Sequence, residues 1–171
     1  MLIPLELLRT ITYGQQYLRE RESWQQVVVV EEVTEIPENT FCFCKNIKRV
    51  IFSNTVVRIK AAAFSQCTSL TYIKFSINIE VIESAAFFKC DLIRVFIPPS
   101  CTHTGYSVFA DNKNLAICHV PQQTQLGHLV IAGTKLIRLF ETNESGGYSQ
   151  SEVVNNWLAE EYQPRRKVFS P

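Results

Sequence analysis

Side chains of the same type return every 23 residues along the middle of the chain. With Ile36 as the origin, phenylalanine lies five residues on and cysteine eight residues on, and Ile59 and Ile82 start two further copies with the same offsets. A weaker fourth copy starts at Thr104. Seven positions in four copies make 28 places, and all but Thr104 and Asn112 hold an apolar residue or cysteine. About half of these places would be apolar by chance in a chain that is 46% hydrophobic, so the period indicates a fold built from repeated structural units.

A unit of 23 residues cannot bury its own apolar side, so stacked copies must share one continuous interior. The segments 49–52, 72–75, 94–97 and 117–120 alternate inward and outward residues with period two, which predicts short strands. Such strands stack in parallel at about 4.8 Å per repeat. Small residues near 61–64 predict a short helical or irregular turn on the outer side. We therefore expect an α/β solenoid of about four repeats, with mainly parallel β-structure on its inner face.

One column of the repeat is entirely aromatic and consists of Phe41, Phe64, Phe87 and Phe109. An exposed ladder of phenylalanines would be an aromatic binding strip, whereas a buried ladder would be the spine of the core. The column keeps the register of the other apolar columns, which favours the buried spine.

A second column holds cysteine at positions 44, 67 and 90, with Asn112 in its fourth place. Zinc sites use closely spaced ligand pairs such as Cys-x-x-Cys, but Cys42 and Cys44 form a Cys-x-Cys pair instead. Disulfides between stacked neighbours are an alternative, because such neighbours approach the required Cα separation. Parallel Cβ vectors and the asparagine favour small, buried, reduced thiols. We therefore expect neither a metal site nor a cofactor.

A cysteine–histidine nucleophilic pair would have to combine Cys118 with His103 or His128. Neighbouring residues on a strand point to opposite faces, so Cys118 should point inward and His119 outward. The sequence lacks the Gly-x-Ser-x-Gly, P-loop, Gly-x-Gly-x-x-Gly and His-Glu-x-x-His patterns. We predict no catalytic residue, and a cysteine- and histidine-dependent enzyme is kept as an alternative.

The repeating unit is Val-x-x-Ile-x-x-x-Ala-Phe-x-x-Cys-x-x-Leu-x-x-Ile-x-Phe, and residues 56–75 match it in full. Over residues 27–121 it closely resembles the BspA-like, or Treponema pallidum type, leucine-rich-repeat family. The resemblance implies a right-handed leucine-rich-repeat solenoid whose inner sheet often binds proteins. Such repeats occur in bacterial surface proteins, in effectors of intracellular bacteria and in parasitic protists. The first copy departs from the pattern at Thr40, and the fourth departs at Thr104, Val108 and Asn112.

The two ends of the chain lose the period and are expected to cap the stack, because an open solenoid end exposes apolar surface and strand edges. Residues 1–24 should form a helical N-terminal cap, and residues 25–121 should form the solenoid. Residues 122–171 should form a C-terminal cap. Within it we expect a β-hairpin from strands at 129–132 and 136–140, then a helix at 151–162 and a basic run at 165–167.

Function is expected on the outward face of the predicted strands. After Gln26 and Val28, that face carries Arg49, Ile51, Tyr72, Lys74, Arg94, Phe96, Ile117 and His119. The set has no acidic residue and mixes arginine, aromatic and aliphatic side chains, as interface hot spots do. We predict that these eight residues bind a protein partner with an acidic and apolar surface. Two alternatives are a sheet face without a partner, and an architectural or targeting segment whose C-terminal helix and basic tail make the contact.

The overall charge and the apolar runs restrict the other classes of partner. A net charge of +1 does not by itself favour binding to nucleic acid or to an anionic membrane. The apolar run at 27–30 stops at Glu31 and Glu32, far short of the roughly 18 residues of a membrane span. Glu6 and Arg9 interrupt the N-terminal apolar run, which also lacks the basic start of a secretory signal. We expect a cytoplasmic protein, or one secreted without an N-terminal signal, for example an effector delivered to a host cell.

Overall fold

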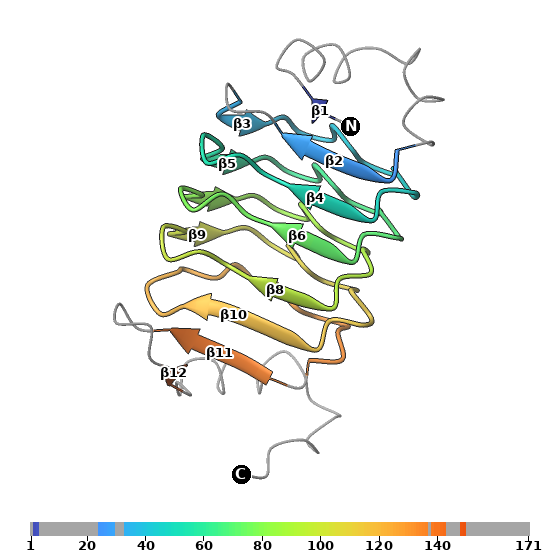
Figure 1. Ribbon diagram of the computed structural model, residues 1–171. Helices are drawn as coiled ribbons and strands as arrows, with labels where there is room; N and C mark the ends of the chain where they lie inside the picture. Colours follow the sequence, from blue (N-terminus) through green and yellow to red (C-terminus); the bar gives the residue numbers. More distant parts are fainter. Residues whose placement is uncertain (1, 4–23, 30–32, 137, 143–147, 150–171) are drawn as a thin grey trace.

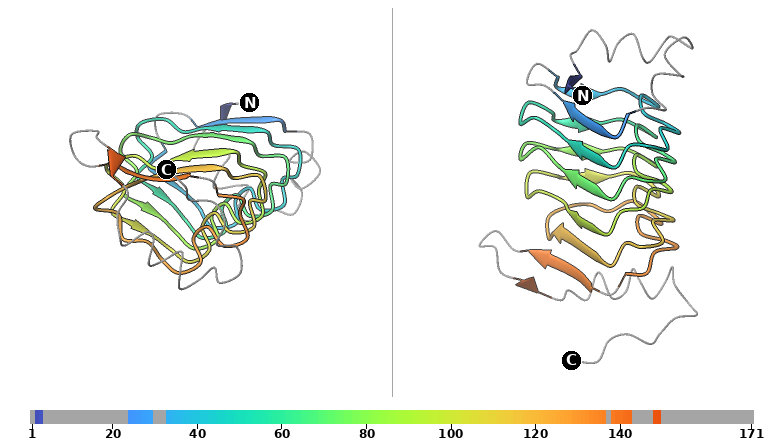
Figure 2. Two further views of the ribbon diagram at one scale, coloured as in Figure 1. Left: turned by 90° about the horizontal axis from the view of Figure 1, so that it is seen from below. Right: turned by 45° about the vertical axis from the view of Figure 1, so that its right-hand side comes forward.

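The computed structural model describes residues 2–3, 24–29, 33–136, 138–142 and 148–149. In this part the chain winds into a solenoid whose turns stack along one axis, from β2 near one end to β11 near the other (Figure 1). Viewed along the stack, each turn has three sides, with strands on two of them and irregular turns on the third (Figure 2). The solenoid predicted from the 23-residue period is therefore confirmed.

The first side carries the strands at the four alternating segments, which become β4, β6, β8 and β10, together with strands that those segments did not predict. In order they are β1 (Leu2–Ile3), β2 (Gln26–Val29), β4 (Arg49–Ile51), β6 (Tyr72–Lys74), β8 (Arg94–Phe96), β10 (Ile117–Pro121), β11 (Arg138–Thr142) and β12 (Tyr148–Ser149). Neighbours pair in parallel, except that β12 pairs antiparallel with β11. Two four-stranded sheets result, divided between β6 and β8. The division falls where the third copy is one residue short, because a missing residue shifts the register of the next strand.

The second side is a parallel sheet of two-residue strands that the sequence did not predict. It consists of β3 (Glu35–Ile36), β5 (Arg58–Ile59), β7 (Val81–Ile82) and β9 (His103–Thr104), in that order. The isoleucines at positions 36, 59 and 82 were assigned to the core, and all three are fully buried. Two residues are too few to show a period of two, so no pattern distinguished these strands from loops.

The third side is made of irregular turns that form a backbone ladder of their own. The Phe41 N–H donates to the Ala63 carbonyl at 2.7 Å, and the Phe64 N–H donates to the Ala86 carbonyl at 2.8 Å. Residues with positive φ, such as Ala62 at 52°, recur in each turn. Positive φ lets consecutive peptide groups turn so that N–H groups point to one neighbouring copy and carbonyls to the other. Of the two forms expected for this side, the irregular turn is the one found.

The phenylalanine column is the spine of the core. Phe41, Phe64, Phe87 and Phe109 are fully buried. Their ring centroids lie 4.8, 5.3 and 5.7 Å apart along the column, with interplanar angles of 16°, 4° and 11°. These separations are those of stacked aromatic pairs, so the buried-spine interpretation is confirmed.

The cysteine column consists of reduced thiols that bond to the neighbouring copy. All six cysteines are free, so the disulfide alternative is wrong. The Cys67 thiol donates to the Phe41 carbonyl at 3.1 Å, and the Cys90 thiol donates to the Phe64 carbonyl at 3.2 Å. Each thiol therefore adds a donor from the next copy to a buried carbonyl that also accepts an N–H within its own copy, from Cys44 at 3.1 Å and from Cys67 at 3.3 Å.

Asn112, which replaces cysteine in the fourth copy, compensates for the residue missing from the third. In the second copy the Leu70 N–H donates to the Cys67 carbonyl at 2.9 Å. In the shortened third copy the Leu92 N–H instead donates to Asn112 Oδ1 at 3.1 Å. Asn112 Nδ2 also donates to the Phe87 carbonyl at 2.8 Å, as the column thiols do. The amide supplies a strong donor and a strong acceptor at this place, whereas a thiol is weak in both roles.

The predicted hairpin at residues 129–132 and 136–140 is wrong. Residues 129–132 are the outer turn of a fifth copy, where the Val130 carbonyl accepts from the Phe109 N–H at 2.7 Å. Strand β11 pairs in parallel with β10, with Ile117 opposite Arg138. The stack therefore continues beyond residue 121. Ile131 takes the phenylalanine place and Thr134 the cysteine place, so the repeat had become too weak to recognise. Of the helical cap predicted at residues 1–24, Leu2–Ile3 form the strand β1 instead, and residues 4–23 lie outside the described residues, as does the helix predicted at 151–162.

Candidate binding surface

The structure brings the eight predicted residues onto one face of the solenoid, in two register groups. Arg49 lies opposite Tyr72, Ile51 opposite Lys74, Arg94 opposite Ile117, and Phe96 opposite His119. The inward residues between them, Val50, Val95 and Cys118, are buried. Tyr72 is 43% exposed and Phe96 is 57% exposed, so large aromatic surfaces face solvent. We call these eight residues the cationic–aromatic face.

Direct contacts order several side chains of this face. The Arg49 guanidinium lies over the Tyr72 ring, 4.7 Å from its centroid. The rings of Phe96 and His119 stack at 4.3 Å with an interplanar angle of 14°. Side chains that are already held in place lose less conformational freedom when a partner binds, so these pairs lower the entropic cost of binding.

Charge is unevenly distributed between the two halves of the face. Partial burial lowers the pKa of His119, because burial disfavours the charged imidazolium. Its neighbours Phe96 and Ile117 are apolar. The positive charge of the β8–β10 half therefore comes from Arg94, whereas the β4–β6 half has Arg49 and Lys74.

Sequence reasoning missed two exposed residues at the edge of this face. Lys48 precedes β4, and Ile93, which is 48% exposed, precedes β8. The two positions belong to one column of the repeat. The Lys48 carbonyl accepts the N–H of Thr71 in the next copy, and the Ile93 carbonyl accepts the N–H of Ala116 in the next copy. Reading the position before each strand as a further column would have found them.

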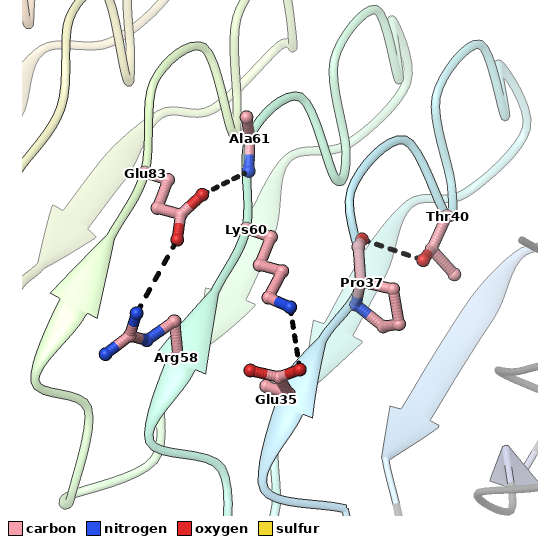
Figure 3. A network of polar contacts seen from close by, with 7 residues as sticks. All are labelled: Glu35, Pro37, Thr40, Arg58, Lys60, Ala61 and Glu83. Carbon is pink, nitrogen blue, oxygen red and sulfur yellow. Dashed lines mark hydrogen bonds and ion pairs between the residues drawn. The ribbon is translucent and has the colours of Figure 1, made fainter.

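The second sheet differs because its cations are paired with carboxylates (Figure 3). Lys60 Nζ lies 2.8 Å from Glu35 Oε1, and Arg58 lies 3.9 Å from Glu83 Oε1. The other oxygen of Glu83 accepts the Ala61 N–H at 3.1 Å. Within the described residues both ion pairs belong to this second side. Among the same described residues, no carboxylate forms an ion pair with a cation of the cationic–aromatic face.

The thiols are unsuited to nucleophilic chemistry. Burial raises the pKa of Cys118 to about 12 and the pKa of Cys101 to about 11, because a thiolate is poorly solvated inside the protein. Within the described part of the chain, no three histidine, cysteine, aspartate or glutamate side chains gather into a group that could hold a metal ion. In the same part, no helix has the length and apolar character needed to cross a membrane.

Alkylation of the native protein should therefore be slow at the buried thiols. At about pH 8 we expect Cys90, Cys101 and Cys118 to react with iodoacetamide far more slowly than in guanidinium, because burial shields the sulfur and keeps it protonated. Half-buried Cys42 should react before them and serves as the internal reference. Time-resolved mass spectrometry of digested samples measures each rate. A native rate at Cys118 equal to the unfolded rate would contradict this and revive the enzyme alternative.

Comparison with known proteins places this architecture in a family. A family model described as BspA type leucine rich repeat region, with six copies, matches residues 12–146, which is most of the chain. The chain belongs to the BspA-type leucine-rich-repeat family. Members of this repeat family are generally protein-interaction modules and typically non-enzymatic. No curated protein matches this BspA-type chain.

Several solved structures share the fold of this BspA-type chain. The leucine-rich-repeat protein of Treponema pallidum has a TM-score of 0.64 at 24% identity, over 67% of this chain and 57% of that one. One from Eubacterium ventriosum has a TM-score of 0.64 at 20% identity, over 80% and 36%. A leucine rich cell surface protein from Faecalibacterium prausnitzii has a TM-score of 0.57 at 25% identity, over 71% and 40%. This chain therefore spans between 36% and 57% of the length of these structures.

Proposed function

We propose that this BspA-type chain binds a protein partner through its cationic–aromatic face. The observation that carries the proposal is the composition of that face: exposed arginine, lysine, tyrosine and phenylalanine lie on β4, β6 and β8, Ile117 and His119 on β10 extend the face, and none of these side chains is acidic. Aromatic residues and arginine are enriched at interface hot spots, where a partner removes them from water. A partner with acidic and apolar surface would complement both kinds of side chain.

The contrast with the second sheet supports this choice of face. Lys60 and Arg58 already have carboxylate neighbours, so a partner that covered them would have to compete with Glu35 and Glu83. Arg49 and Lys74 make no ion pair within the described residues, so an acidic partner could pair with them directly. The electrostatic field of unpaired cations also speeds the encounter with an acidic partner.

The location of the protein is a proposal that rests on its thiols. We propose a reducing compartment, either the cytoplasm or the interior of a host cell reached by secretion without an N-terminal signal. Six free cysteines, five of them buried, suit a compartment in which thiols stay reduced. The similarity to a cell surface protein of Faecalibacterium prausnitzii favours the opposite location, and the oxidation state of the thiols in material isolated from its source separates the two.

Replacing Arg49, Tyr72, Arg94 and Phe96 together by alanine should abolish partner capture and leave the melting temperature nearly unchanged. These side chains are exposed, and surface substitutions usually change stability by less than about 0.5 kcal/mol each. The measurement is a quantitative pull-down from native or host lysate, with melting followed by differential scanning fluorimetry.

The matched control replaces Arg58, Lys89, His103 and Tyr106, which are exposed on the other two sides of the solenoid. This control variant should capture the partner as the wild type does. Capture that survives the Arg49, Tyr72, Arg94 and Phe96 variant would show that another surface binds. If capture instead depends on residues 151–171, the architectural or targeting alternative holds, with the C-terminal segment as the contact.

A further inference from the structure

Together with Lys48 and Ile93 at its edge, the cationic–aromatic face has two chemically different halves along the solenoid axis. Towards β4 and β6 it carries a cationic half, defined by Lys48, Arg49 and Lys74, all exposed. Towards β8 and β10 it carries an apolar half, defined by Ile93, Phe96 and Ile117. The two halves meet where the sheet divides between β6 and β8, and Arg94 lies just beyond that division.

No described residue neutralises the charge of the cationic half. None of its three residues forms an ion pair with any described residue, and both ion pairs found there belong to the second sheet. Arg49 is held by the Tyr72 ring, which attracts a cation but does not cancel its charge. This half is therefore suited to carboxylates.

The apolar half offers exposed hydrophobic surface with the imidazole of His119 at its edge. Phe96 is 57% exposed and Ile93 is 48% exposed, so both side chains leave apolar surface in contact with water. The His119 ring stacks on Phe96 and extends the aromatic surface by a second ring. An aromatic or aliphatic side chain that covers these groups removes apolar area from water.

The dimensions of the face set the spacing that a ligand must match. Strands β4, β6 and β8 are three residues long, so the face is short along the strand direction and longer along the solenoid axis. The centres of the two halves are two repeats apart, which is roughly 10 Å at the spacing of neighbouring strands. An extended chain covers that distance in about three residues.

From this arrangement we infer that the face binds an extended acidic segment of a partner protein, lying along the solenoid axis. Its carboxylates contact the cationic half, and an apolar anchor about three residues away covers Phe96, Ile93 and Ile117. This inference rests on the proposed function, because it specifies the ligand of the same face. A polarised face also selects a direction, since a reversed segment would bring its carboxylates to a half in which Arg94 is the one described cation and would leave the three cations of the other half uncovered.

Synthetic peptides test the inference without knowledge of the partner. The probes are fluorescein-labelled peptides of about ten residues, with two glutamates at one end of the central part and tryptophan and leucine about three residues away. Both chain orders are made, with a scrambled peptide of equal composition and a peptide with lysines in place of the glutamates. Fluorescence anisotropy against the full chain gives the affinities, at low and at physiological salt.

Two variants of the protein make the test specific. In Arg49→Glu with Lys74→Glu, binding of the acidic peptide should fall by about tenfold or more, and the lysine peptide should now bind. In Ile93→Ala with Phe96→Ala, binding of the acidic peptide should fall by a similar factor, and the lysine peptide should still not bind. The control, Lys89→Glu with Lys113→Glu, changes two exposed lysines on the turn side and should stay within about twofold of the wild type.

Each outcome separates this inference from the proposed function. One peptide order that binds better than the scrambled peptide, with rescue by charge reversal, supports the inference. If no peptide binds but the alanine replacement of Arg49, Tyr72, Arg94 and Phe96 still abolishes partner capture, the function stands and the extended acidic segment is refuted. If capture survives that replacement, the proposed function and this inference are both refuted. A single-stranded oligothymidine that binds more tightly than every peptide, and loses binding in the charge-reversed variant, would overturn the inference in favour of nucleic acid.

Discussion

Replacement of Phe64 by alanine is expected to lower the free energy of unfolding by about 3–5 kcal/mol. The ring is fully buried and stacks on Phe41 at 4.8 Å and on Phe87 at 5.3 Å. It also meets the Phe52 ring edge-on at 5.7 Å. One truncation therefore leaves a cavity at two interfaces between copies at once. In a solenoid each copy is stabilised by its neighbours alone, so neither interface can be replaced by contacts elsewhere.

Chemical denaturation followed by circular dichroism measures this effect. The matched control is Phe96→Ala, since Phe96 is the same residue type with 57% of its surface exposed, and it should change stability by less than about 0.5 kcal/mol. Equal losses for the two variants would mean that the phenylalanine column is not the spine of the core. The shape of the transition adds a second readout, because weakened coupling in mid-stack should broaden it.

Replacement of Asn112 by alanine is the second large effect, with an expected loss of about 2–4 kcal/mol. Asn112 is fully buried, and its side chain accepts the Leu92 N–H and donates to the carbonyls of Phe87 and Phe109. Alanine leaves these buried groups without a partner, and each unsatisfied group costs about 1–3 kcal/mol before relaxation. The same denaturation experiment measures the loss.

A change of Asn112 to cysteine separates the two roles of the amide. The thiol can donate to the Phe87 carbonyl, as Cys90 donates to the Phe64 carbonyl, but the Leu92 N–H loses a strong acceptor. The loss in the free energy of unfolding should therefore be smaller than that of the alanine variant but greater than zero. Asn114→Ala is the control, because Asn114 bonds to Asp91 at the surface. A cysteine variant as stable as the wild type would contradict the compensation between the third and fourth copies, although cysteine is the residue of the family pattern.

Such compensation explains why departures from a repeat need not weaken it. The third copy lost one residue and the fourth exchanged its thiol for an amide, and the two changes meet at one hydrogen bond between copies. The division of the first sheet between β6 and β8 lies on the other side of the shortened third copy. The irregularity also separates the cationic half of the candidate face from its apolar half, so it coincides with the change in surface chemistry.

The candidate surface could be predicted from the sequence to a large extent. The alternation in each strand placed Arg49, Tyr72, Arg94 and Phe96 outward, and the 23-residue period placed them on the same face. The pairing of Arg49 with Tyr72 and of Phe96 with His119 could not be predicted, because it depends on the rotamers of side chains from different copies. Whether a cation was already paired, as Lys60 is with Glu35, was hidden for the same reason.

The sequence by itself determined the stacking, the buried columns and the outward residues, because a regular period repeats one local environment in every copy. Only the tertiary structure decided how the irregular places were filled. It showed the second sheet at β3, β5, β7 and β9, the amide bond of Asn112 to Leu92, and the continuation of the stack into β11, where a hairpin had been predicted. These features depend on contacts between residues about one repeat apart, whose partners are known only once neighbouring turns lie against each other.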